Sequence, residues 1–175
     1  MHACDSGYAR YSKDWQSGDG EYLPFAPNAF DTVVYEDARA IFDTMASFVC
    51  HGLFWRNPGL RIGVVENGGA WVPRLLNLFA AVQAKLPHSF EEDPIETFKR
   101  HVWVNPFHED NMAGLIDTLG ADRIMFGSDF PHPEGLADPA AYSADLEAEE
   151  ISPDVIARVM GGNLRELLTP RPVAS

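Results

Sequence analysis

One carboxylate of the chain stands directly after a short apolar run. Residues 123–135 read RIMFGSDFPHPEG, in which the apolar residues 124–126 are followed by Gly127 and then, two positions on, by Asp129. The apolar run predicts a short buried strand, and the glycine predicts an abrupt end to it. Because ligands and metals sit at the carboxyl ends of parallel strands, Asp129 could ligate a metal, orient a water molecule or take its proton. The alternative is a carboxylate that caps a turn or pairs with a cation.

Three further side chains are candidates for the same chemistry. Glu66 follows a second apolar run, LRIGVV, and His2 stands at the start of the chain, where the alternative is a frayed terminal residue. Imidazole and carboxylate groups suit zinc, iron or manganese. His132 lies three residues after Asp129, either facing the same pocket as a substrate contact or bonded to backbone as a loop histidine. No two histidines form an H-x-H or H-E-x-x-H pair, so spacing alone gives no complete metal site.

Alternating helical and strand patterns must position these side chains. Helices are predicted from apolar spacing over residues 36–50, 71–86, 95–100, 111–119 and 153–168, the last with a break at Gly161 and Gly162. Short strands are predicted over residues 60–65, 101–105 and 124–126. This order predicts an α/β fold with a parallel sheet and right-handed crossovers. Residues 2–35 have little regular pattern and are expected to form either a lid or a segment that packs on further parts of a larger fold.

Composition excludes several classes of partner. The 175 residues include 26 acidic and 13 basic side chains, a net charge of −13, which argues against nucleic acid and gives no support for an anionic membrane surface. No stretch is apolar over the length needed to cross a membrane, and the first ten residues lack the pattern of a signal peptide. Cys4 and Cys50 fit neither a disulfide framework nor a zinc-finger spacing. We therefore expect a reduced, cytoplasmic protein.

Five stretches of the chain, taken in order, resemble one known family. They read DSGY, HGLFWRNPGLRIGVVENGGAWVP, ETFKRHVWVNPF, DTLGADRIMFGSDFPHPEG and VMGGNLRELL. The chain thereby resembles the amidohydrolase-related (amidohydrolase 2) family of metal-dependent hydrolases and decarboxylases, whose members include aminocarboxymuconate-semialdehyde decarboxylase. The FGSDFPHPEG element is the most specific of these matches.

The resemblance implies a (β/α)8 TIM barrel with one divalent metal, zinc first, with iron or manganese as alternatives. It implies that Asp129 is the aspartate after the last barrel strand, as a metal ligand or as the catalytic base. His2 matches a metal-ligating histidine after the fifth strand. Glu66 falls where many members carry a histidine in an HGG motif, which reads ENGG here, so that a carboxylate ligand is expected in its place. His132 is expected to contact the substrate.

The length of the chain departs from the family pattern, since a barrel needs roughly 250 residues. The chain begins at what resembles the fifth strand, so that residues 1–175 are expected to form a single domain equivalent to strands five to eight. Three functions remain open. They are a hydrolase with weak activity alone, in which metal-activated water attacks a carbonyl-type centre; a decarboxylase of a small carboxylated substrate; and a non-catalytic half-barrel that serves binding or assembly. The expected partners are a small-molecule substrate and either a second copy of the chain or a missing N-terminal half.

Overall fold

The structure is a computed structural model that describes residues 1–2, 14–15, 38–133 and 135–170. Most of the segment expected to be a lid or a packing segment, together with Cys4, lies outside the described residues. In the described part of the chain, no helix is long and apolar enough to cross a membrane.

A small parallel sheet forms the centre of the fold. Strand β1 (Ile62–Val64) pairs in parallel with β2 (Val102–Val104). Single parallel bridges extend the sheet on both sides, joining His2 to Val65 and Val104 to Ile124. The strand predicted over residues 124–126 is therefore present as a bridge, and the predicted parallel α/β arrangement is confirmed.

The helices follow the predicted order. Their bounds are α3 (Arg39–Cys50), α4 (Leu53–Arg56), α5 (Trp71–Lys85), α6 (Pro94–His101), α7 (Met112–Leu119), α8 (Tyr142–Ala148), α9 (Pro153–Ala157) and α10 (Asn163–Leu168). Short turns of other helical types are η1 (Pro87–Ser89), η2 (Ala121–Arg123), η3 (Pro139–Ala141) and η4 (Arg158–Gly162). Non-helical backbone at Gly161 confirms the predicted break between α9 and α10. The sequence did not predict α4 or α8.

Local sequence explains where two of these helices begin. The Asp93 carboxylate accepts hydrogen bonds from the backbone N–H groups of Ile95 and Glu96 at 2.9 and 3.0 Å, and so caps α6. The Asn111 side chain accepts from Gly114 N–H at 2.9 Å and caps α7 in the same way. These caps fix where α6 and α7, the helices before and after β2 in the chain, begin.

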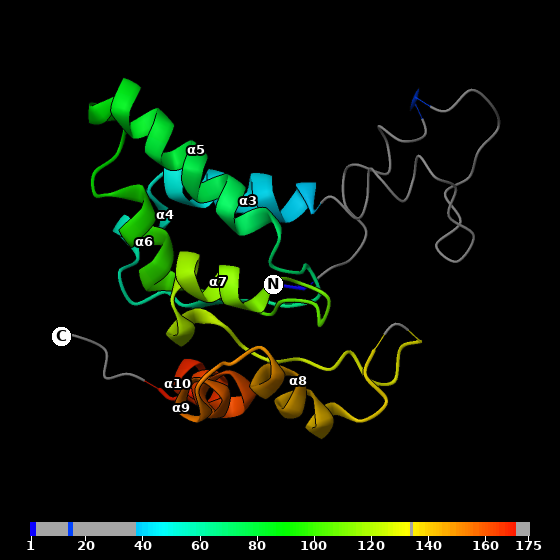
Figure 1. Ribbon diagram of the computed structural model, residues 1–175. Helices are drawn as coiled ribbons and strands as arrows, with labels where there is room; N and C mark the ends of the chain where they lie inside the picture. The colour runs from blue at the N-terminus through cyan, green and yellow to red at the C-terminus, as the bar shows by residue number, and fades with distance from the viewer. Residues whose placement is uncertain (3–13, 16–37, 134, 171–175) are drawn as a thin grey trace.

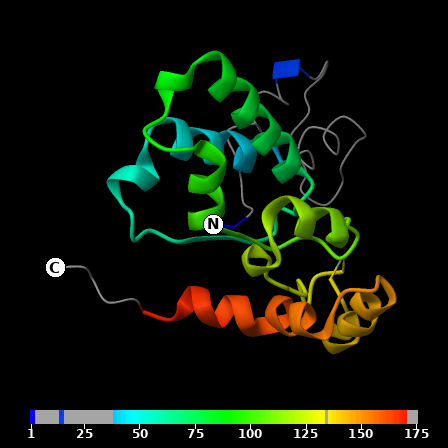
Figure 2. The ribbon, with the colours of Figure 1, turned by 60° about the vertical axis from the view of Figure 1, so that its left-hand side comes forward.

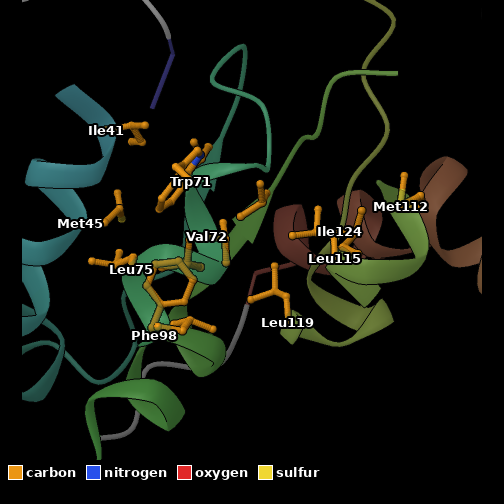
Figure 3. Close-up of a cluster of buried hydrophobic side chains, with 14 of the residues drawn as sticks. Ile41, Met45, Trp71, Val72, Leu75, Phe98, Met112, Leu115, Leu119 and Ile124 are labelled. Atoms are coloured by element: carbon orange, nitrogen blue, oxygen red, sulfur yellow. The ribbon is translucent and has the colours of Figure 1, made fainter. Parts of the chain in front are cut away.

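Two layers of helices enclose the sheet. Figures 1 and 2 show α3, α4, α5 and α6 on one side of the strands and α8, α9 and α10 on the other. The strand residues Val64, Val102 and Val104 belong to one buried cluster with side chains from α3, α5, α6, α7, α8 and α9. Figure 3 shows part of this cluster, including Met45, Leu75 and Phe98. The burial of these apolar side chains is the main stabilising contribution to such a fold.

The C-terminal helix covers the opposite face of the sheet. A Cβ atom added to Gly63 would lie 3.1 Å from Leu167 Cδ2 and 3.3 Å from Met125 Cε. The Arg61 guanidinium donates to the carbonyl oxygens of Glu166 and Thr169, at 2.9 and 2.7 Å, at the C-terminal end of α10. Because Gly63 has no side chain, α10 can approach β1 closely.

The segment from η4 to α10 also closes one edge of the sheet. The Asn163 side-chain amide donates to the carbonyl oxygens of Ile124 and Ala121, at 2.7 Å each, and Asn163 is 2% exposed. Phe126 N–H donates to the Val159 carbonyl oxygen at 2.9 Å. Backbone groups that would otherwise be open to a further strand are thus satisfied by the chain's own C-terminal segment.

Candidate metal centre

Two carboxylates stand at strand exits on either side of β2, and both residues have a positive φ. Glu66 follows β1 and Asp129 follows the bridge at Ile124, and their φ angles are 55° and 56°. Both residues lie in the left-handed region, which is unfavourable for residues other than glycine and asparagine. Such strain persists only where surrounding structure imposes it, and it is frequent at functional sites.

The turn after Asp129 returns His132 to the same place. His132 N–H donates to the Asp129 carbonyl oxygen at 2.8 Å, and the two side chains meet with 3.1 Å between His132 Nδ1 and Asp129 Oδ1. A Cβ atom on Gly135 would lie 2.6 Å from the Asp129 carbonyl oxygen, so this close turn requires glycine. The turn includes a cis peptide bond between Phe130 and Pro131.

Three potential metal ligands meet at this point. One ligand atom each from Glu66, Asp129 and His132 lies within 4.8 Å of the other two. Glu66 and Asp129 are partly buried, and His132 is exposed. Among the described residues, this is the group of three or more such side chains close enough to hold one cation.

His2 joins the group through Glu66. The His2 Nε2 atom lies 3.0 Å from Glu66 Oε2, and the bridge between His2 and Val65 sets this pairing. The structure thus brings all four predicted side chains to one end of the sheet. His2 contacts a carboxylate of the group, and His132, predicted as a substrate contact, supplies the third donor of the cluster.

The donor set fits a divalent transition metal. It combines one imidazole with two carboxylates, which is a set that zinc, iron and manganese accept. Two carboxylates balance the charge of a dication, and the partial burial of both limits competition from water. The residues present therefore fit the kind of metal that the sequence predicts.

Asn105 was not predicted as part of the site, although it stands at the exit of β2 between the two carboxylate-bearing exits. Its side chain is 7% exposed and its amide donates to the Pro106 carbonyl oxygen at 2.9 Å. A Cβ atom on Gly127 would lie 2.8 Å from Asn105 Oδ1, so the amide packs directly on the backbone that leads to Asp129. The strand-exit argument that selected Glu66 could have selected Asn105 as well.

Asp110 was also missed. It lies in the loop after β2 and its Oδ2 atom accepts hydrogen bonds from Gly69 N–H at 2.6 Å and Phe107 N–H at 2.9 Å. It thereby joins the loop that carries Glu66 to the loop that follows β2. Nothing in the spacing of HEDN in the sequence signals this contact, because its donors are backbone groups from distant positions.

Comparisons with known proteins bear on the site as a whole. A protein-family model described as amidohydrolase matches residues 14–169. No curated protein matched the chain. A solved structure, amidohydrolase map2389c from Mycobacterium avium subsp. paratuberculosis K-10, is 38% identical with a TM-score of 0.85 over 97% of this chain and 41% of its own.

A second solved structure shares the fold at lower identity. It is 5-carboxyvanillate decarboxylase LigW from Sphingomonas paucimobilis, with a TM-score of 0.54 and 23% identity over 76% of this chain and 40% of that chain. The present chain therefore spans about two fifths of the length of each of these two proteins.

Proposed function

Because the chain belongs to the amidohydrolase family, we propose that it is a metal-dependent hydrolase domain in which Glu66, Asp129 and His132 hold one divalent cation, with zinc as the first candidate. The observation that carries this proposal is the meeting of three donors, from two strand exits, within 4.8 Å of one another. His2 is the fourth member, and it orients Glu66 through their 3.0 Å contact.

The side chains have distinct roles in this proposal. A bound dication would polarise a carbonyl-type centre and lower the pKa of a water molecule. Asp129 accepts the proton of the attacking water and returns it to the leaving group. His132 Nδ1 lies 3.1 Å from Asp129 Oδ1, and this contact holds the Asp129 carboxylate in one orientation. Glu66, in place of an imidazole, supplies a negative charge to the ligand set.

The proposed fold context is one half of a (β/α)8 barrel. Four parallel elements, contributed by His2, β1, β2 and Ile124, correspond in this proposal to strands five to eight of a single domain. The TM-score of 0.85 with a mycobacterial amidohydrolase supports this correspondence. The carboxyl ends of barrel strands are where catalytic groups of such folds lie.

We propose a small molecule with an apolar part as the substrate. Phe107, next to the Glu66 loop, is 46% exposed, and Phe130, next to Asp129, is 66% exposed. Exposed aromatic rings beside a polar site favour a ligand that offers an apolar surface to them and a carbonyl group to the site.

Metal binding is the first test of this function. We expect about one zinc or manganese ion per chain by elemental mass spectrometry after equilibration with the metal alone and gel filtration. Asp129→Ala removes a ligand and should lose the metal, whereas Asp117→Ala, which removes an exposed carboxylate on α7, should retain it. Wild-type protein without metal, or equal metal in Asp129→Ala, would contradict the proposal.

Hydrolysis and decarboxylation can then be separated by their products. The zinc-loaded protein is incubated in 18O-labelled water with a panel of aryl amides, aryl esters and aryl carboxylates. Hydrolysis incorporates the label into a carboxylic acid product, which is the result expected here. Release of carbon dioxide with no label in the organic product would favour the decarboxylase instead.

A further inference from the structure

We propose that Asp110 is a positioning residue for the metal centre, in that its carboxylate fixes the loop after β1 and thereby the place of the Glu66 carboxylate. This inference rests on the proposed function, because it concerns the ligand that Glu66 supplies. Asp110 itself is not one of the three clustered donors.

One carboxylate oxygen joins the two loops. Asp110 Oδ2 lies 2.6 Å from the Gly69 nitrogen and 2.9 Å from the Phe107 nitrogen, and both groups donate to it. Hydrogen bonds to an ionised acceptor are shorter and stronger than neutral ones. The loop after β1 is thus tied to the loop after β2 at a single, partly buried atom.

Steric contacts leave the tied loop little freedom to shift. A Cβ atom on Gly68, whose φ is 60°, would lie 2.8 Å from the Phe107 ring and 3.3 Å from Asp110 Oδ2. A Cβ atom on Gly69 would lie 2.6 Å from Leu115 Cδ2. The two glycines of ENGG therefore let the backbone pass between Phe107 and α7, close enough for Asp110 to reach it.

Glu66 lies between two fixed points of the backbone. On one side, β1 pairs with β2, and Val65 N–H donates to the Met1 carbonyl oxygen at 2.7 Å. On the other side, Asp110 holds Gly69, and Trp71 Nε1 donates to the Gly68 carbonyl oxygen at 2.9 Å. Only Glu66 and Asn67 connect these points, so the left-handed conformation of Glu66 is imposed by what holds its two flanks.

The acceptor, rather than the charge, is what the loop needs from Asp110. In Asp110→Ala, the N–H groups of Gly69 and Phe107 lose their acceptor and the loop loses its tie. In Asp110→Asn, the amide oxygen still accepts from the same donors. A direct electrostatic effect of Asp110 on the cation would instead be lost in both variants.

The test compares the dissociation constant for manganese or zinc alone, by isothermal titration calorimetry, in full-length wild-type, Asp110→Ala, Asp110→Asn and Asp117→Ala proteins. Groups that orient ligands typically contribute 10- to 100-fold in metal affinity. We expect a loss of about that size in Asp110→Ala, a loss of less than about threefold in Asp110→Asn, and no change in Asp117→Ala. Equal affinity of Asp110→Ala and wild type, or equal loss in Asp110→Ala and Asp110→Asn, would overturn the inference.

A second measurement separates loop position from folding. In 1H–15N spectra without metal, we expect the amide signals of residues 66–69 to move in Asp110→Ala, while signals of β2 stay in place and the melting temperature confirms a folded chain. Unmoved loop signals would overturn the inference. Failure of the wild-type protein to bind metal would instead remove the proposed function itself, which makes the two failures distinguishable.

Discussion

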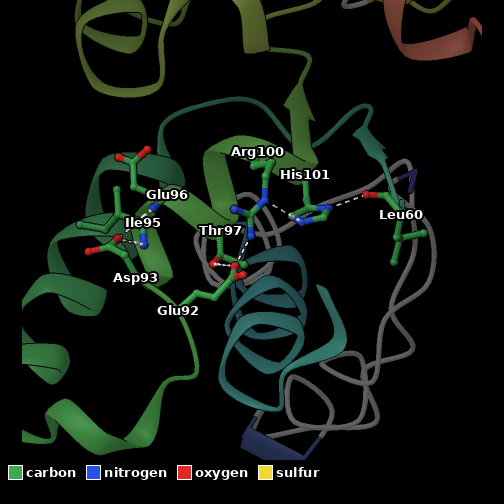
Figure 4. Close-up of polar contacts among 8 residues, drawn as sticks. All are labelled: Leu60, Glu92, Asp93, Ile95, Glu96, Thr97, Arg100 and His101. Carbon is green, nitrogen blue, oxygen red and sulfur yellow. Dashed lines mark hydrogen bonds and ion pairs between the residues drawn. The ribbon is translucent and has the colours of Figure 1, made fainter. Parts of the chain in front are cut away.

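His101 shows how burial and hydrogen bonds favour one protonation state of a side chain. It ends α6 and is 1% exposed, and its ring stacks on Phe54 with 4.6 Å between centroids. Its Nδ1 atom lies 2.6 Å from the Leu60 carbonyl oxygen, and its Nε2 atom accepts from Arg100 Nε at 3.2 Å (Figure 4). A neutral ring with its proton on Nδ1 satisfies both contacts. Burial is the main cause that lowers the pKa of His101 below 6.5.

This lowered pKa predicts a loss of stability in mild acid. At a pH between the folded-state pKa of His101 and about 6.5, the unfolded chain binds more protons than the folded one. The free energy of unfolding should therefore fall as pH falls through 6.5 and level off below the folded-state pKa. The checks are urea unfolding between pH 7.5 and 5 and an NMR titration of the ring.

The control for this prediction is the exposed His88. His88→Gln should keep the dependence on pH, whereas His101→Gln should weaken it even if the variant is less stable at every pH. A measured pKa of His101 at or above 6.5 would contradict the prediction.

At the same scale, the sequence indicated candidate residues for the site but not the contacts between them. Asp129 and Glu66 could be selected because each follows an apolar run that becomes part of the sheet or its bridge. The 3.1 Å contact between His132 and Asp129 could not be predicted, since it depends on a tight turn that is closed by Gly135. The contribution of Asp110 depends on backbone donors, which have no sequence pattern.

Elements of the fold were predictable where their apolar spacing is long. Helices α3, α5 and α7 carry buried residues at helical intervals, and their ends agree with the predicted ones within a few positions. Helix α4 has four residues, too few for a period. Helix α8 buries only Tyr142 and Leu146, too few residues for a helical period. Its position is set by tertiary contact, since the Tyr142 ring stacks on the Phe126 ring with 5.0 Å between centroids. Burial also raises the pKa of Tyr142 to about 12.

The junction between α10 and the edge of the sheet gives a prediction for an element. Asn163→Ala removes the amide that donates to two carbonyl groups, Ala121 and Ile124, and leaves them without this donor. We expect the free energy of unfolding to fall by about 1–3 kcal/mol. Urea unfolding measures it, with Asn77→Ala on the exposed face of α5 as the matched control, expected within about 0.5 kcal/mol of wild type. Equal free energies of unfolding in the two variants would contradict a stabilising role of the Asn163 hydrogen bonds.

The loop between β1 and α5 gives a second prediction for an element. Gly68→Ala places a Cβ atom 2.8 Å from the Phe107 ring at a φ of 60°. The left-handed conformation alone costs about 1–2 kcal/mol for a side chain other than glycine. We expect the free energy of unfolding, measured by thermal unfolding, to fall by at least that amount. The part of this loss that comes from the contact with the Phe107 ring should be recovered in a double variant with Phe107→Ala. Gly59→Ala, which meets no atom within 4 Å, serves as the control and should be close to neutral.

The molecule as a whole has a sheet with two unlike edges. The edge at Ile124 and Phe126 is occupied by Asn163 and Val159, so a strand added there must displace them. The opposite edge is formed by the bridge of His2 to Val65. A second copy of the chain is one of the two partners expected from the sequence. If two copies associate through their sheets, we expect the contact to lie on the side of His2.

Light scattering tests the association itself. We expect a mass near twice 19.4 kDa at micromolar concentration. Among the described residues, no strand continues the sheet beyond the bridge of His2, and such an edge can pair with another chain. The net charge of −13 opposes the pairing, so that the dimer should strengthen as salt is added. A single species of 19.4 kDa at all concentrations and salt levels would contradict this expectation.

The central claim is that the strand exits of this chain hold a divalent metal, and anomalous X-ray scattering at the zinc edge tests it most directly. Crystals grown with zinc should give one strong anomalous peak in contact with the side chains of Glu66, Asp129 and His132. Its absence from crystals of Asp129→Ala would confirm the assignment of the ligands. A peak held by other side chains only, or no peak in wild-type crystals, would contradict the account.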